Sequence, residues 1–365
     1  MFTDIVKIAL GHQYSMILKR DGSVWSTDNT LRLLRGKSID FVLAIPSGVT
    51  AMAAGYAHSI VIKKDDSVWA TGSNYRGQLG DGTRERKDTF VFVLTLPAAK
   101  DAAAGGRHTL VLTQAGRVWV AGWNQYGQLG SGPKHYTTRF FVAIPGGVKA
   151  VAAGEQHSMV LKQDGSVWAT GRNENGQLGD GSNADRSSFF KVMFSGVMGV
   201  AAGGYHSMVL KEDGSVWATG CNKYGQLGDG SLTDRKDYVQ VVSRRAKSIA
   251  AGSRHSMVLK KDGSVWATGY NKYGQLGHKP PINSEIFLQV IPDGAKLVAA
   301  GASHSMVLKQ DGSIWATGTN AYGQFGDSST KSESKFIKLA SIGIGLDTIR
   351  SYTYDFISIY TISRH

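Results

Sequence analysis

Six histidines recur at steps of 49 or 50 residues along this 365-residue chain, and they are the first residues whose chemistry needs an explanation. They are His58, His108, His157, His206, His255 and His304, with Tyr14 in the equivalent place of a first copy. Imidazoles bind metals and carry protons near neutral pH. Each of these histidines, however, opens a short apolar segment and is far from the next one along the chain. We therefore expect no metal site, but buried histidines whose ring nitrogens bond backbone around a turn.

The glycine-rich loops of sequence GQLGDGS could be taken for phosphate-binding loops. No helical pattern follows them and no Lys-Ser or Lys-Thr pair ends them, as a nucleotide-binding P-loop requires. The chain also has no HExxH motif, no Cys–His couple and no isolated Ser/His/Asp set. We expect a protein without catalytic residues, cofactor or metal.

The tryptophans reveal the element that carries the histidines. Trp25, Trp69, Trp119, Trp168, Trp217, Trp266 and Trp315 follow one another at steps of 44, 50, 49, 49, 49 and 49 residues. A fixed period of this size indicates one supersecondary unit stacked many times. The tryptophans are expected to pack between neighbouring units.

The fourth copy shows what the unit is. Lys149–Ala153, His157–Lys162, Ser166–Gly171 and Phe189–Met193 are short apolar or β-rich segments, and an Asp-Gly turn joins the second to the third. Four short strands without helical periodicity are typical of a propeller blade. The sequence predicts an all-β, seven-bladed β-propeller with four antiparallel strands per blade and a ring closed by the terminal segments.

We expect a single propeller domain over residues 1–365. The repeats are predicted at about 5–48, 49–98, 99–148, 149–197, 198–246, 247–295 and 296–345. Residues 346–365 would be a decayed partial repeat or a closing strand, and the sequence does not decide which terminal piece closes the ring.

The formal net charge is +13, and much of it comes from a lysine repeated beside the Asp-Gly turn. Because an acid usually lies two residues further on, we expect a solvated, largely self-neutralised rim, and a protein partner with an acidic surface in preference to nucleic acid. The single Cys221 and a poor N-terminal signal favour an intracellular protein, cytoplasmic or nuclear. No segment is apolar for long enough to be a membrane helix.

The repeated pattern GxxHS…DGxVWxxGxNxxGQLG resembles the regulator of chromosome condensation repeat family over nearly the whole chain. The first copy keeps DGSVW but has STDNTLRLLRGKS in place of the loop. The resemblance implies an exchange factor or regulator of a Ran-like small GTPase. Copies two to seven leave no room for the inserted hairpin that forms the wedge of the founding members. The basic N-terminal tail of those members is not expected either, because the chain begins almost at its first strand. An inhibitor-type binding propeller and a fragment of a larger ubiquitin ligase are further alternatives.

The residues that vary between copies are the candidates for binding. Two loops of each blade, the pair inside GxxH and the segment around the loop asparagine, are predicted on the same face of the disc. Their Tyr, Trp and Arg residues belong to the types enriched in binding hot spots, although half of the tyrosines could instead cap blade edges. We predict a non-catalytic interaction propeller whose partner-binding residues are Tyr56, Arg107, Trp123, Arg172, Tyr205, Arg254 and Tyr270.

Overall fold

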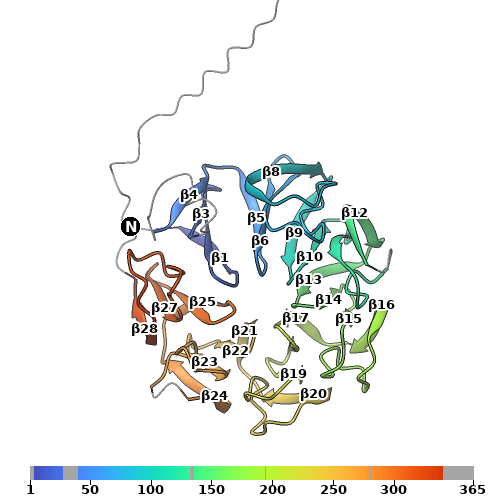
Figure 1. Ribbon diagram of the computed structural model, residues 1–365. Helices are drawn as coiled ribbons and strands as arrows, with labels where there is room; N and C mark the ends of the chain where they lie inside the picture. The colour runs from blue at the N-terminus through green and yellow to red at the C-terminus, as the bar shows by residue number, and fades with distance from the viewer. Residues whose placement is uncertain (1–3, 28–39, 132–134, 194, 280–281, 340–365) are drawn as a thin grey trace, which may run out of the picture.

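Seven four-stranded antiparallel sheets stand around a common axis in the computed structural model (Figure 1). It describes residues 4–27, 40–131, 135–193, 195–279 and 282–339. These residues form strands and turns, and they contain no helix. The predicted all-β, seven-bladed propeller is confirmed. The C-terminal segment 346–365, and most of the divergent loop of the first copy, lie outside the described residues.

Each blade takes its four strands in chain order. The bounds in blades 1 to 3 are β1 (Ile5–Leu10), β2 (Ser15–Lys19), β3 (Val24–Ser26), β4 (Val42–Ile45), β5 (Val49–Ala54), β6 (His58–Lys63), β7 (Ser67–Gly72), β8 (Lys87–Thr95), β9 (Ala99–Ala104), β10 (His108–Thr113), β11 (Val118–Trp123) and β12 (Tyr136–Ile144). Those in blades 4 and 5 are β13 (Val148–Ala153), β14 (His157–Lys162), β15 (Val167–Gly171), β16 (Arg186–Met193), β17 (Val197–Ala202), β18 (His206–Lys211), β19 (Val216–Gly220) and β20 (Arg235–Val242). Those in blades 6 and 7 are β21 (Ala246–Ala251), β22 (His255–Lys260), β23 (Val265–Gly269), β24 (Ser284–Ile291), β25 (Ala295–Ala300), β26 (His304–Lys309), β27 (Ile314–Gly318) and β28 (Glu333–Lys338).

The first strand of each blade lies nearest the axis, and in blades 2 to 7 it ends in two alanines, as in VTAMAA of β5 and VKAVAA of β13. The blades converge there, so only small side chains fit between neighbouring sheets. The second strand is buried on both faces because another blade covers each side of it.

The tryptophans lie in the seams between blades, as predicted. Trp69 of blade 2 packs against a cluster that combines Met16 and Val24 of blade 1 with Val61 of blade 2. Its indole N–H donates to Ser67 Oγ at 2.8 Å, and the Lys63 ammonium lies 3.9 Å from the ring centroid. The tryptophans are half-buried, and in at least five of the seven hairpins a lysine lies over the ring.

This arrangement also corrects the expected rim of facing charges. Lys63, Lys162, Lys211, Lys260 and Lys309 each lie over the tryptophan of their own hairpin. The turn aspartates accept hydrogen bonds from the serine two residues on, as Asp164 does from Ser166. Within the described chain, none of these five lysines forms an ion pair with a turn aspartate.

The repeated histidines are buried, as predicted, but their hydrogen-bond partner is different from the one expected. His157 Nε2 lies 2.9 Å from Ser207 Oγ of the next blade, and that hydroxyl donates to the backbone carbonyl of Gln177 in the blade of the histidine. The Ser207 hydroxyl uses its only proton in the bond to this carbonyl, so it must accept a hydrogen bond from the histidine. His157 is therefore protonated on Nε2. His157 Nδ1 has no hydrogen-bond partner among the described residues. The histidine therefore joins two blades instead of bracing one turn.

The seam between blades 1 and 2 is joined by different residues. Blade 1 has no GQLG loop to offer a carbonyl, and Tyr14 replaces the histidine. Ser59 of blade 2 donates to the Tyr14 hydroxyl at 2.8 Å, and that hydroxyl donates to the carbonyl of His58 at 2.7 Å. The tyrosine thus accepts the bond that a carbonyl accepts in the other seams and, like the histidine there, joins its blade to the next.

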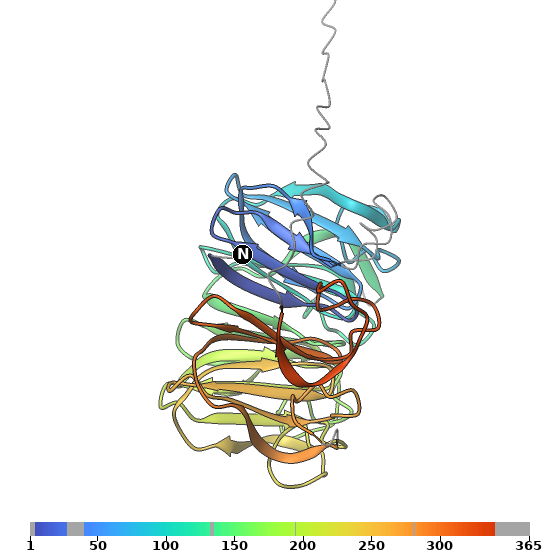
Figure 2. The same ribbon diagram turned by 90° about the vertical axis from the view of Figure 1, so that its left-hand side faces the viewer.

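The ring closes by direct contact between blades 1 and 7, which lie side by side in Figure 2. His304 Nε2 lies 3.0 Å from Ser15 Oγ, which donates to the Gln324 carbonyl at 2.7 Å. The Ala302 amide donates to the carbonyl of Gly11 at 3.4 Å. Within the described residues this seam uses the same bonds as the others, with no strand exchanged between the ends. The C-terminal segment 346–365, which was expected to be a decayed partial repeat or a closing strand, lies outside the described residues, so that part of the prediction is not tested.

Candidate functional site

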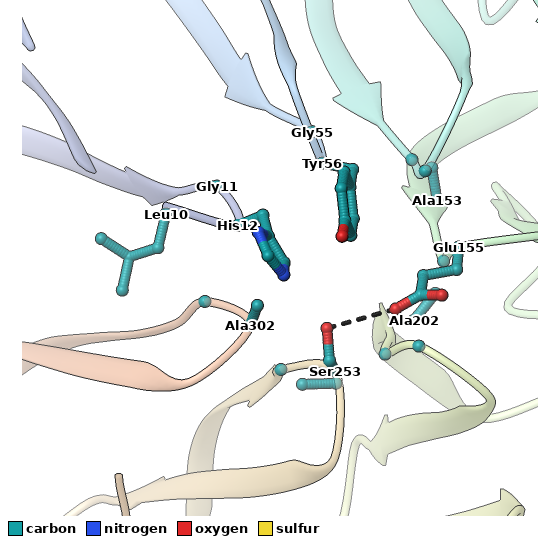
Figure 3. A pocket seen from close by; sticks show the side chains of 18 of the residues that line it. Leu10, Gly11, His12, Gly55, Tyr56, Ala153, Glu155, Ala202, Ser253 and Ala302 are labelled. Carbon is teal, nitrogen blue, oxygen red and sulfur yellow. Dashed lines mark hydrogen bonds between the residues drawn. The ribbon is translucent and has the colours of Figure 1, made fainter. Parts of the chain in front are cut away.

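A narrow pocket of about 170 Å³ lies on the axis, where the loops after the seven first strands converge. The backbone forms its wall: an amide of each blade donates to a carbonyl of the next, at 3.1–3.4 Å, all the way around the ring. Four polar or aromatic side chains point into it in Figure 3, namely those of His12, Tyr56, Glu155 and Ser253.

The pocket has an aromatic side and an acidic side. His12 stacks on Tyr56 with ring centroids 4.0 Å apart, and Ser253 donates to the Glu155 carboxylate at 3.3 Å. Burial lowers the pKa of His12 against an opposing effect of Glu155, so its ring is neutral at pH 7. Burial and the neighbouring Glu155 raise the pKa of Tyr205 to about 12.

Further from the axis, arginines lie over aromatic rings of neighbouring blades. The Arg172 guanidinium of blade 4 lies 4.9 Å from the Tyr126 ring of blade 3 and 5.8 Å from the Tyr205 ring of blade 5. It also forms an ion pair with Glu174 and donates to the side-chain carbonyl of Gln156. One arginine thus ties three blades together at the surface.

Blades 5 and 6 repeat the arrangement with other residues. Arg254 lies 5.3 Å from the Tyr224 ring and 5.8 Å from the Tyr270 ring. The two tyrosines meet edge to face at 4.7 Å, and Tyr270 also contacts Tyr273. Arg254 is exposed and has no ion-pair partner in the described part of the chain.

Trp123 departs from its prediction. We expected an exposed side chain, but only 9% of the residue is accessible. Arg76 and Arg107 lie over its ring, at 5.9 and 5.6 Å, and Tyr126 packs against it edge to face. Trp123 thus lies beneath two arginines.

These arginines open onto a second pocket, of about 350 Å³, between blades 2 and 3. Its charged lining consists of Arg76, Arg84 and Arg107. Arg84 is held by a bond from Nε to the carbonyl of Tyr75 and lies over the ring of Tyr136. None of the lining residues is acidic, which distinguishes this pocket from the axial one.

All seven predicted residues lie on the face that bears these loops. The structure brings together Arg107 with Trp123, Arg172 with Tyr205, and Arg254 with Tyr270. Tyr56 lies apart from these pairs and lines both pockets. His12, Glu155, Arg76 and Arg84 were not among these seven predicted residues. The alignment of Gly11–Tyr14 with GxxH could have revealed His12, whereas nothing in the sequence places Arg84 beside Arg107.

No group of three or more His, Cys, Asp or Glu side chains with metal-binding geometry occurs in the described ranges. The described part also contains no helix able to cross a membrane.

Comparison with known proteins identifies the family. The sequence model of the RCC1-like domain matches residues 99–351, more than half of the chain. The chain belongs to the RCC1-like domain family. Regulator of chromosome condensation (RCC1) repeat models also match residues 49–78 and 65–112. No curated protein sequence matches the chain.

Solved structures share the fold of this RCC1-like propeller. Yeast RCC1 (Prp20), in its complex with Kap60, is 19% identical, with a TM-score of 0.75, over 84% of this chain and 79% of that one. Human WBSCR16 is 24% identical, with a TM-score of 0.75, over 85% of this chain and 87% of that one. Prp20p from Saccharomyces cerevisiae, described with its binding to Gsp1p and histones, is 19% identical, with a TM-score of 0.71, over 80% and 77%. At this identity the likeness establishes the fold alone.

Proposed function

We propose that this RCC1-like propeller is a non-catalytic interaction protein whose loop face binds an acidic surface of a partner protein. By loop face we mean the side that bears Tyr56, Arg107, Arg172, Tyr205, Arg254 and Tyr270. The observation that carries the proposal is the row of arginines held over aromatic rings across blades 2 to 6.

The arrangement supports binding for an energetic reason. An arginine already held against a ring loses less conformational freedom when it pairs with a partner carboxylate than a free side chain does. Arg76, Arg107 and Arg254 have no ion pair within the described residues, so their charges remain available. Around them, exposed Tyr75 and Tyr273 offer apolar contact area. An intracellular partner fits the single, buried Cys221.

The test is a quantitative capture experiment from cell lysate with two matched variants. The loop-face variant replaces Arg107, Arg254 and Tyr270 with alanine. The control variant replaces Arg117, Lys261 and Gln310 with alanine. These residues are exposed at the opposite end of the blades, and their replacement removes two positive charges, as in the loop-face variant. Partners that bind wild type and the control but not the loop-face variant support the proposal. Equal capture by all three proteins would place the binding surface elsewhere.

Exchange activity on a Ran-like small GTPase is the second candidate, favoured by membership of the RCC1-like domain family. Each sheet has four strands in the described residues, without the additional hairpin expected of a wedge. The decisive assay is nucleotide release from a panel of small GTPases. No acceleration at micromolar propeller would remove this candidate and leave the interaction proposal intact.

A further inference from the structure

The pocket between blades 2 and 3 is lined by three arginines and by no acidic residue. Arg76 comes from the loop after β7, Arg84 from the segment before β8, and Arg107 from the turn between β9 and β10. Three guanidinium groups therefore converge on one cavity, two from the β7–β8 connection and one from the β9–β10 turn of the next blade. Their mutual repulsion makes this arrangement costly when the cavity holds only water.

The structure fixes these side chains and leaves their charges unpaired. Arg84 Nε donates to the Tyr75 carbonyl at 3.0 Å, and Arg76 and Arg107 lie over Trp123. Within the described chain none of the three forms an ion pair, whereas Arg172 on the same face pairs with Glu174. Trp123 is buried in part because the guanidinium groups of Arg76 and Arg107 cover its ring.

We propose that this pocket is a specific site for an oxyanion group, a phosphate monoester or a carboxylate, carried by a side chain of the partner. Guanidinium groups bind such oxyanions through paired, charge-assisted hydrogen bonds. The flanking Tyr56 and Tyr75 rings, 46% and 62% exposed, would contact the carbon skeleton that bears the group. The inference rests on the proposed interaction function and names the chemistry that the loop face recognises.

The site can be tested without knowing the partner, by titrating the labelled full-length chain and following backbone amide resonances. Phenyl phosphate and benzoate are the probes, and benzyl alcohol is the neutral probe. We expect saturable shifts at Arg76 and Arg107 with the anions and none with the alcohol. Tighter binding of phenyl phosphate identifies a phosphorylated side chain as the natural group, and equal or tighter binding of benzoate identifies an acidic one.

The variants are Arg84→Gln and Arg107→Gln, with Arg117→Gln as the control. All three arginines are exposed, and the Arg117→Gln substitution removes one positive charge from the opposite end of blade 3. Loss of one charge-assisted bond should weaken anion binding about tenfold or more in the first two variants and leave the control unchanged. An unchanged thermal midpoint verifies the fold of each variant.

Two results would overturn the inference: no binding of either anion, or equal weakening by Arg117→Gln, which would indicate general charge attraction. The outcome is separable from that of the proposed function. Failure of the probes together with partner loss in the loop-face variant would leave an interaction propeller without an anion pocket.

Discussion

The seams between blades and the loop face arise from the same repeat, yet they differ in how often each contact occurs. In the seams, the bond from a histidine to a hydroxyl of the next blade occurs six times, at 2.9–3.0 Å. On the loop face, the contacts differ from place to place: Arg76 and Arg107 share the Trp123 ring, whereas Arg172 and Arg254 each lie over two tyrosines of their own. Repetition indicates a contact that holds the ring together, and variation marks a surface that can be specific for one partner.

The largest loss of stability is expected when acid protonates the seam histidines. Burial lowers the histidine pKa values, to about 4 for His58 and His206 and to about 3 for His108, His157, His255 and His304. Unfolded histidine titrates near 6.5, so the stabilisation is complete above pH 6.5 and is lost as the pH falls towards 3. At pH 5 each histidine would cost about 2 kcal/mol, and six together exceed a typical free energy of unfolding.

We therefore expect cooperative acid unfolding with a midpoint near pH 5, measured by tryptophan fluorescence. A propeller that keeps its native fluorescence down to pH 4 would show that these imidazoles can be protonated in place.

A methyl group placed in a seam should have the next largest effect. A Cβ on Gly252 would lie 2.3 Å from the His255 ring and 2.4 Å from the Gly301 carbonyl oxygen, both of which are fixed. We expect Gly252→Ala to reduce the free energy of unfolding by about 3 kcal/mol. Gly146→Ala is the control, since its Cβ would meet only the Ala115 carbonyl at 3.5 Å. That variant should be neutral or gain about 0.5 kcal/mol in urea unfolding.

Removing a seam hydroxyl should distinguish blade 1 from the other blades. Ser256→Ala leaves the His206 N–H and the Gln226 carbonyl buried without a partner, at a cost of about 2 kcal/mol. Ser59→Ala should cost about 1 kcal/mol, because the Tyr14 hydroxyl keeps its bond to the His58 carbonyl. If urea unfolding shows the same loss of free energy for both variants, the bond from Tyr14 to the His58 carbonyl does not compensate for the missing hydroxyl.

The smallest change in stability is expected on the loop face. Arg107→Ala and Arg254→Ala remove exposed side chains that contact rings without burying a charge. Each should change the free energy of unfolding by about 0.5 kcal/mol or less. A loss above about 2 kcal/mol in thermal or urea unfolding would mean that these arginines hold the blades together.

The sequence determines the fold because its information is repeated. Each Asp-Gly turn, tryptophan and GxxH glycine predicts the same local structure in successive blades, so the copies support one another's interpretation. Closure of the ring was harder to predict, because Ser15 bonds His304 and Gln324, and these residues of the first and last blades meet only in the finished ring.

The loop face could be predicted only in part. Chain direction placed the variable loops on one side, which is why the seven candidates share a face. Whether a side chain there is exposed or covered depends on the neighbouring blade, and Trp123 was misjudged for that reason. Arg84 approaches Arg107 across a seam, and no spacing within one repeat encodes that contact.

The most direct test of the division between seams and loop face is the amount of partner captured by equally stable variants. The Arg107, Arg254 and Tyr270 alanine variant should lose the proteins that wild type retains, while the Arg117, Lys261 and Gln310 variant keeps them. Retention of every partner by the first variant, at an unchanged thermal midpoint, would contradict a role of this face in recognition.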